Sequence, residues 1–141
     1  MNVLAVLTAV VFAALSALHV YWAVGGRRGL GAVIPTVEGR RTLNPSPPVT
    51  IVVAVALALA AAITLGATGI LAAVAPAWVI RCGLVGLAVV FVARAVGDFR
   101  LIGVTKRVRE TRFARLDTWV FVPLCIGLGA ACATLAWLAD P

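Results

Sequence analysis

The sequence predicts an all-α, polytopic membrane protein whose four transmembrane helices form an antiparallel bundle. Hydrophobic residues make up 63% of its 141 residues, charged residues only 12%, and the mean hydropathy is +1.12. A soluble domain carries about 25% charged residues, so this composition excludes one. Four apolar stretches have the length of about 20 residues that crosses a bilayer core, and they leave too little chain for a separate soluble domain. We therefore expect residues 1–141 to form a single membrane domain.

The first expected transmembrane helix covers residues 3–23. No Lys or Arg precedes it, whereas Arg27 and Arg28 follow it closely. A cleavable signal peptide has a positively charged start and a shorter apolar core. We therefore interpret this segment as a retained helix whose N-terminus lies outside the cell.

The second expected helix covers residues 50–75 and ends before Pro76, which cannot continue a helix. Small residues occupy every fourth position on one of its faces, where another backbone can approach closely. This face can pack the helices of the bundle together, or it can dock a helix of another protein. Its residues are Ala54, Ala58, Ala62 and Gly66.

The third and fourth expected helices cover residues 78–98 and 117–138. Pro123 cannot donate a hydrogen bond to the carbonyl of Trp119, which either leaves that acceptor open or bends the fourth helix. All four tryptophans lie near an expected helix end, where their rings favour the headgroup region of the bilayer. They are Trp22, Trp78, Trp119 and Trp137.

The basic residues predict an orientation. Ten of the 12 lie in two connections, four between the first two helices and six between the last two. The positive-inside rule makes these connections cytoplasmic and places both termini outside the plasma membrane. Because these residues flank apolar helices, we expect anionic headgroups of the lipid bilayer as their partner, and no nucleic acid. The ten are Arg27, Arg28, Arg40, Arg41, Arg100, Lys106, Arg107, Arg109, Arg112 and Arg115.

The connection over residues 99–116 has two interpretations. Leu101, Val104 and Val108 recur at helical intervals among basic residues, which is typical of a short amphipathic helix at the membrane surface. A solvated basic loop explains the same composition.

Four ionisable residues lie near the cytoplasmic ends of the expected helices: His19, Arg94, Asp98 and Asp117. Such a residue costs about 2.5–3.5 kcal/mol at the centre of a transmembrane helix. At a rise of about 1.5 Å per residue, all four fall within about two turns of the inner boundary. Three helices therefore place polar groups at one depth, which predicts either a small site or a structural cluster.

Each of these residues also has a purely structural interpretation. Arg94 and Asp98 are four residues apart and can pair within one helix, or Arg94 can extend to the headgroups. Asp117 is placed to cap the N-terminus of the fourth helix. His19 can pack as a structural histidine, or it can exchange a proton near neutral pH.

The sequence predicts no metal site and no cofactor. Cys82, Cys125 and Cys132 lie inside apolar segments and form no CxxC pair. The sequence also shows no nucleophile–base pair and no phosphate-binding loop motif.

Four runs carry a family resemblance: residues 17–23 (ALHVYWA) followed by a Gly-Gly pair, 94–100 (RAVGDFR), 113–117 (FARLD) and 123–125 (PLC). Together they resemble a bacterial family of small four-helix integral membrane proteins, domain-of-unknown-function family 3995. The resemblance covers nearly the whole chain and implies no activity. It does imply that five residues belong to the signature of the family, namely His19, Tyr21, Trp22, Asp98 and Asp117.

These observations favour a binding or catalytic site for an amphipathic ligand, such as a lipid, an isoprenoid or a quinone. In this hypothesis His19 exchanges a proton, Asp98 or Asp117 orients it, and Arg94 contacts an anion. The alternatives are a transporter or channel-like homo-oligomer, and an accessory subunit of a membrane complex. The candidate ligand-binding residues are His19, Tyr21, Trp22, Arg94, Asp98 and Asp117.

Overall fold

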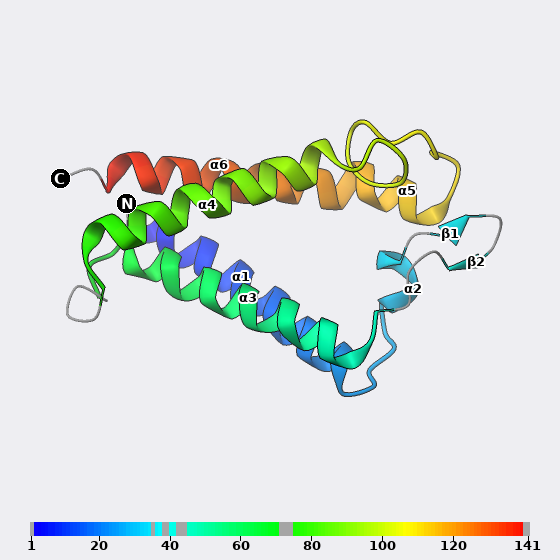
Figure 1. Ribbon diagram of the computed structural model, residues 1–141, viewed down its shortest axis with the longest axis horizontal. Coiled ribbons are helices and arrows are strands. Elements are labelled where there is room, and N and C mark those ends of the chain that lie inside the picture. The colour runs from blue at the N-terminus through cyan, green and yellow to red at the C-terminus, as the bar shows by residue number, and fades with distance from the viewer. Residues whose placement is uncertain (1, 35, 38–39, 42–44, 71–74, 140–141) are drawn as a thin grey trace.

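Four long helices form two antiparallel pairs (Figure 1). In the first pair, α1 (Asn2–Ala23) packs along α3 (Pro47–Gly66). In the second pair, α4 (Ala77–Val96) packs along a helical segment that covers Arg112–Leu138. This computed structural model describes most of the chain: residues 2–34, 36–37, 40–41, 45–70 and 75–139.

The chain is an all-α membrane protein, as the sequence predicts. Within the described residues, four helices are long and apolar enough to cross a membrane. They are the helices that the sequence predicts, with different ends, and the last of them continues from a short helix into the long α6 (Val122–Leu138).

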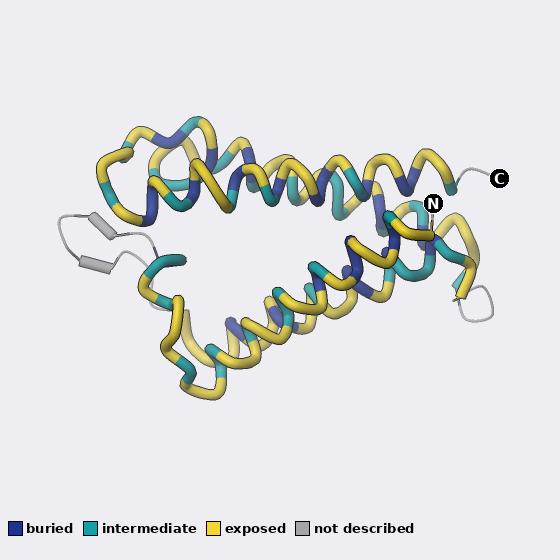
Figure 2. The backbone as a smooth tube through the Cα atoms, turned by 180° about the vertical axis from the view of Figure 1, so that it is seen from behind, coloured by how far each residue is buried: buried dark blue, intermediate teal, exposed yellow. Residues whose placement is uncertain are grey.

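The two pairs meet at one end of the molecule and diverge toward the other (Figures 1 and 2). At the joined end, Ala5, Leu84 and Leu135 are fully buried in one core cluster. Farther along, the rings of Phe12 and Phe91 bridge the pairs, with centroids 5.2 Å apart. The opposite end carries the arginine-rich connections, and we call it the basic end.

The connection from α1 to α3 also reaches the second pair. It contains α2 (Leu30–Val33) and an antiparallel pair of two-residue strands, β1 (Thr36–Val37) and β2 (Arg40–Arg41). Helix α2 lies against α5 (Arg112–Leu116) of the second pair. The two pairs are therefore in contact at the basic end through α2, as well as at the joined end.

Helix α3 differs from its predicted range of residues 50–75 at both ends. It begins at Pro47, because a proline in the first turn gives up only an N–H group that has no helical partner there. It ends at Gly66, and a hydrogen-bonded turn follows at residues 67–70. Residues 71–74 of the predicted range lie outside the described part of the chain.

The small-residue face of α3 packs within this chain only at its two ends. Ala54 is buried and its carbonyl accepts a hydrogen bond from Ser16 Oγ at 2.8 Å. A Cβ on Gly66 would lie 2.6 Å from Ile80 of α4. Ala58 and Ala62 are exposed, so among the described residues the middle of this face is not covered by another helix of the chain.

The last transmembrane segment begins five residues before its predicted start at Asp117. The Thr111 hydroxyl caps α5 by accepting the N–H of Ala114 at 3.1 Å. A π-helical turn, η1 (Asp117–Phe121), joins α5 to α6 (Val122–Leu138). Pro123 has no N–H and its ring crowds the carbonyl four residues earlier, which accounts for the wider turn just before it. The predicted role of Asp117 as the N-cap is therefore wrong.

Candidate functional site

Asp117 is the centre of a buried ion cluster at the basic end of the second pair. Its side chain is fully buried. Oδ1 accepts a hydrogen bond from Arg94 Nη2 at 2.9 Å, and Oδ2 accepts from Lys106 Nζ at 3.0 Å and from the Gly103 N–H at 2.8 Å. A buried carboxylate is stable only with such partners. We call Arg94, Lys106 and Asp117 the ion cluster.

Lys106 reaches the ion cluster from the loop that covers residues 97–111. Its side chain is only 4% exposed, and Nζ also donates to the Gly103 carbonyl at 3.0 Å. The loop folds back over the end of α4, where the N–H groups of Val104 and Thr105 bind the carbonyls of Ala95 and Val96. Over residues 97–111 the segment is a loop with exposed arginines and not an amphipathic helix, but its lysine is buried rather than solvated.

Asp98 organises the start of this loop. Its Oδ1 accepts the N–H groups of Leu101 at 2.7 Å, Ile102 at 2.9 Å and Arg100 at 3.0 Å. Its limited burial raises the pKa of Asp98, but the N–H groups of Leu101, Arg100 and Ile102 outweigh that effect and hold the pKa below its usual 3.8.

The predicted pairing of Arg94 with Asp98 is wrong. Helix α4 ends at Val96, and Gly97 turns the chain at φ +94°, a left-handed conformation that favours glycine. Asp98 therefore leaves the helical face that carries Arg94. The guanidinium pairs with Asp117, 23 residues later.

The ion cluster holds two cations and one carboxylate, so its net charge is +1. Arg94 is 33% exposed, but its Nη1 atom is buried and has no hydrogen-bond acceptor within the described residues. A buried donor without an acceptor calls for an explanation such as a bound water, ion or ligand. The ion cluster therefore has both a charge and a hydrogen-bond donor that the described residues do not balance.

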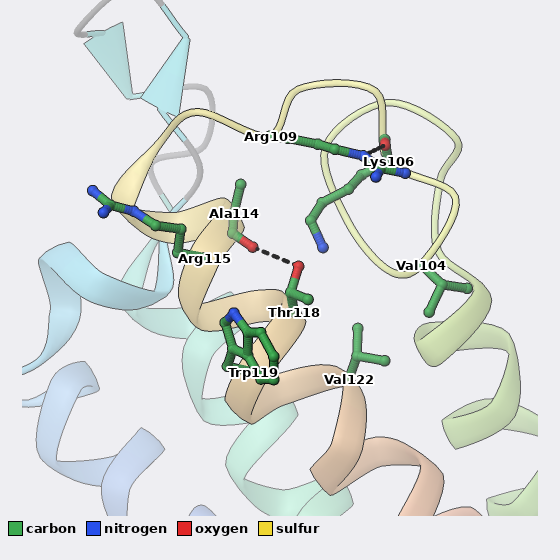
Figure 3. A pocket seen from close by; sticks show the side chains of 8 residues that line it. All are labelled: Val104, Lys106, Arg109, Ala114, Arg115, Thr118, Trp119 and Val122. Atoms are coloured by element: carbon green, nitrogen blue, oxygen red, sulfur yellow. Dashed lines mark hydrogen bonds between the residues drawn. The ribbon is translucent and has the colours of Figure 1, made fainter.

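A pocket of about 290 Å³ borders the ion cluster (Figure 3). The Lys106 ammonium points into it, and Arg109 lies along its rim with Nε donating to the Lys106 carbonyl at 3.3 Å. The guanidinium of Arg115 points away from the other labelled side chains. The lining residues come from the loop and from the start of the last helix: Val104, Lys106, Arg109, Ala114, Arg115, Thr118, Trp119 and Val122.

One side of this pocket is apolar and open to the outside of the helix pair. The Trp119 side chain is 80% exposed and Val104 57% exposed, while Val122 is buried beneath them. Indole rings favour the headgroup level of a bilayer. The pocket therefore combines cations with a surface that suits lipid chains.

His19 lies on the first pair, apart from the ion cluster. Its Nδ1 bonds the Leu15 carbonyl at 2.8 Å, and its ring meets Trp22 edge-on at 5.1 Å between centroids. Because a carbonyl only accepts, Nδ1 carries the hydrogen, and Nε2 of the neutral ring is an acceptor. Within the described part of the chain, the hydrogen bond of His19 stays inside its own helix.

Tyr21 and Trp22 hold the turn after α1. The Trp22 indole donates to the Arg28 carbonyl at 2.9 Å, and the Tyr21 hydroxyl accepts the Arg28 N–H at 3.4 Å. Gly26 lies against the Tyr21 ring, which a Cβ at that position would overlap. These two aromatic residues have a structural role in the first pair.

Sequence reasoning missed Lys106 and Arg109 as site residues. A signal was available, because Lys106 is the only lysine among 12 basic residues. Its compact ammonium lies between the Asp117 carboxylate and the Gly103 carbonyl and donates to both. The only lysine in the sequence therefore occupies a buried position with a specific pair of hydrogen-bond acceptors.

The three cysteines are free in the structure. Cys82 is exposed on α4, whereas Cys125 and Cys132 are buried. None of them lines the pocket.

Comparisons with known proteins agree with this description and add no activity. A family model described as "Protein of unknown function (DUF3995)" matches residues 12–132. No curated protein and no solved structure matches the chain. The matched range contains all four transmembrane helices in whole or in part, the ion cluster and the pocket. The chain belongs to the DUF3995 family.

Proposed function

We propose that the protein binds an amphipathic ligand with an anionic head at the basic end of the second helix pair. The observation that carries this proposal is the excess positive charge of the ion cluster beside the pocket. A buried charge is costly unless an opposite charge compensates it. An anion in the pocket supplies the charge that Asp117 alone does not.

The surroundings of the pocket favour a ligand with a hydrocarbon part. Val104 and Trp119 are exposed on the outside of the pair, next to the cations of the loop. Apolar side chains in this position face lipid when the four helices span a bilayer. A lipid or a charged isoprenoid fits this arrangement better than a neutral quinone, which carries no compensating charge.

The proposal is for binding rather than catalysis. His19, the candidate proton carrier, lies on the other helix pair, and its hydrogen bond is to its own helix. The positive-inside rule places the basic end at the cytoplasmic face of the plasma membrane. The ligand would then enter sideways from the inner leaflet.

Lipid analysis of the protein in its native membrane tests the proposal. Discs cut directly from the membrane by a polymer keep bound amphiphiles with the protein, and mass spectrometry identifies them. We expect an anionic amphiphile enriched over the surrounding bilayer. The enrichment should fall in Arg109→Gln/Arg115→Gln, which removes two cations from the pocket rim.

Arg27→Gln/Arg28→Gln is the matched control. It removes the same charge from the same end of the molecule, on the connection of the first pair. Its enrichment should equal that of the unchanged protein. A lipid composition equal to that of the bulk bilayer in all three proteins contradicts the proposal.

A further inference from the structure

We infer that the head of this ligand is a phosphate or a diphosphate, bound by Lys106 and Arg109. The inference rests on the proposed function and specifies the chemistry of the ligand. It follows from the donors that face the pocket, from the size of the pocket and from the charge of its lining.

Lys106 offers a donor that points into the pocket. An ammonium has three N–H groups. Two of them bind the Gly103 carbonyl and Asp117 at 3.0 Å each. The third is available to a ligand, and Figure 3 shows the ammonium directed between the loop and the start of the last helix.

Arg109 offers a second set of donors at the rim. A guanidinium has five N–H groups, and Arg109 uses its Nε to bind the Lys106 carbonyl at 3.3 Å. This bond holds the guanidinium beside Lys106 while its Nη groups stay available to a ligand. Arg115 is exposed at the same pocket, and rotation of its side chain would bring a further guanidinium to a bound anion.

Donors from an ammonium and a guanidinium fit a phosphate better than a carboxylate. A phosphate presents several oxygens in a tetrahedral arrangement, so it can accept hydrogen bonds from different directions, whereas a carboxylate presents only two coplanar oxygens. Among the described residues that line the pocket, none is a carboxylate that would repel it. The acidic partner of Lys106, Asp117, is already shared by Arg94 and Lys106.

The volume of the pocket indicates which part of the ligand it can hold. Its volume of about 290 Å³ lies at the lower limit of small-molecule pockets, which hold about 300–1,000 Å³. A head group fits this volume, and the hydrocarbon chains of a lipid do not. The chains would then lie along the exposed surface of Trp119 and Val104, within the bilayer.

Binding of defined amphiphiles to delipidated protein, followed by native mass spectrometry, tests the inference. Dioctanoyl phosphatidate and farnesyl diphosphate represent the two sources of a phosphate head, a lipid and an isoprenoid. Dioctanoylglycerol has the same chains without the phosphate, and dodecanoate has a carboxylate head. We expect at least one phosphate-headed probe to bind about tenfold or more tightly than both of the others, and the tighter of the two phosphates identifies the source.

Two variants connect this preference to the pocket. Arg109→Gln/Arg115→Gln should weaken binding of the preferred phosphate about tenfold, and Arg27→Gln/Arg28→Gln should leave it unchanged. Equal thermal unfolding of the two variants shows that neither result reflects misfolding. If they unfold differently, the single variant Arg109→Gln replaces the double one, since Arg109 is exposed and lies outside the ion cluster.

The outcomes separate the inference from the proposed function. If dodecanoate or dioctanoylglycerol binds as tightly as the phosphates, the inference is overturned, while an enriched amphiphile in native discs still supports the proposed function. If the rim variants bind phosphate normally, Arg109 does not bind the phosphate and the inference is overturned. If no probe binds and no amphiphile is enriched, both proposals fail.

Discussion

At the basic end, the first helix pair satisfies its polar side chains with its own backbone, whereas the second pair joins charges from three segments. His19 bonds the carbonyl four residues before it, and Trp22 bonds the turn that follows α1. Arg94, Lys106 and Asp117 come from α4, from the loop and from η1. Polar residues at one depth of a bundle can therefore form a local structural turn on one pair and a shared charged site on the other.

Loss of Asp117 should produce the largest loss of stability, and it tests the contrast between the two helix pairs most directly. Asp117→Ala leaves Arg94 and Lys106 without their carboxylate, and removal of one partner from a buried ion pair costs about 3–5 kcal/mol. His19→Ala removes one hydrogen bond from the other pair, which costs about 0.5–1.5 kcal/mol. Chemical unfolding in detergent micelles measures both, and similar losses of stability would show that the two pairs do not differ.

Gly26→Ala should produce a smaller loss of stability, and its structural effect should be confined to the first pair. The added methyl group would overlap the Tyr21 ring, whose hydroxyl bonds Arg28, and such overpacking costs about 1–3 kcal/mol. Gly31→Ala is a matched control in the same connection, because nothing lies within 4 Å of a Cβ there. The midpoint of unfolding should fall for the first variant only, while phosphate binding at the second pair is retained in both.

The smallest expected effect is a pH response of the loop over residues 97–111. The pKa of Asp98 is lowered in the folded protein, so its contribution to stability is present at neutral pH and is lost as the pH falls through that lowered pKa, below 3.8. The protection of the Arg100, Leu101 and Ile102 amides against hydrogen exchange, measured relative to the intrinsic exchange rate at each pH, should therefore fall only in that acidic range. In Asp98→Asn this protection should already be low at neutral pH and should not change through this transition.

Much of the fold can be predicted from the sequence, because apolar segments of bilayer length are conspicuous. Their ends are less predictable, since Pro47 and Pro48 are typical of a loop and also fit the first turn of a helix. The start of the last helix depends on the hydroxyl of Thr111, a residue type that also occurs in turns.

The site is only partly predictable, and the two carboxylates show why. Asp98 and Asp117 are both close enough in depth to pair with Arg94, and the sequence favours Asp98 by its spacing. The turn at Gly97 decides between them, because it removes Asp98 from the helix. The depth of a residue in the membrane follows from its position in the sequence. The side of the helix pair on which a loop residue lies cannot be predicted in this way.

The sharing of Asp117 has a consequence for biogenesis. During synthesis α4 enters the membrane before α6, so Arg94 emerges 23 residues before Asp117, the carboxylate with which it pairs in the folded protein. An ionised side chain near a helix end is tolerated at the interface, but the final acid is buried between two cations. We therefore expect the last two helices to complete their integration as one hairpin, in which Asp117 pairs with Arg94 and Lys106 once both helices are in place.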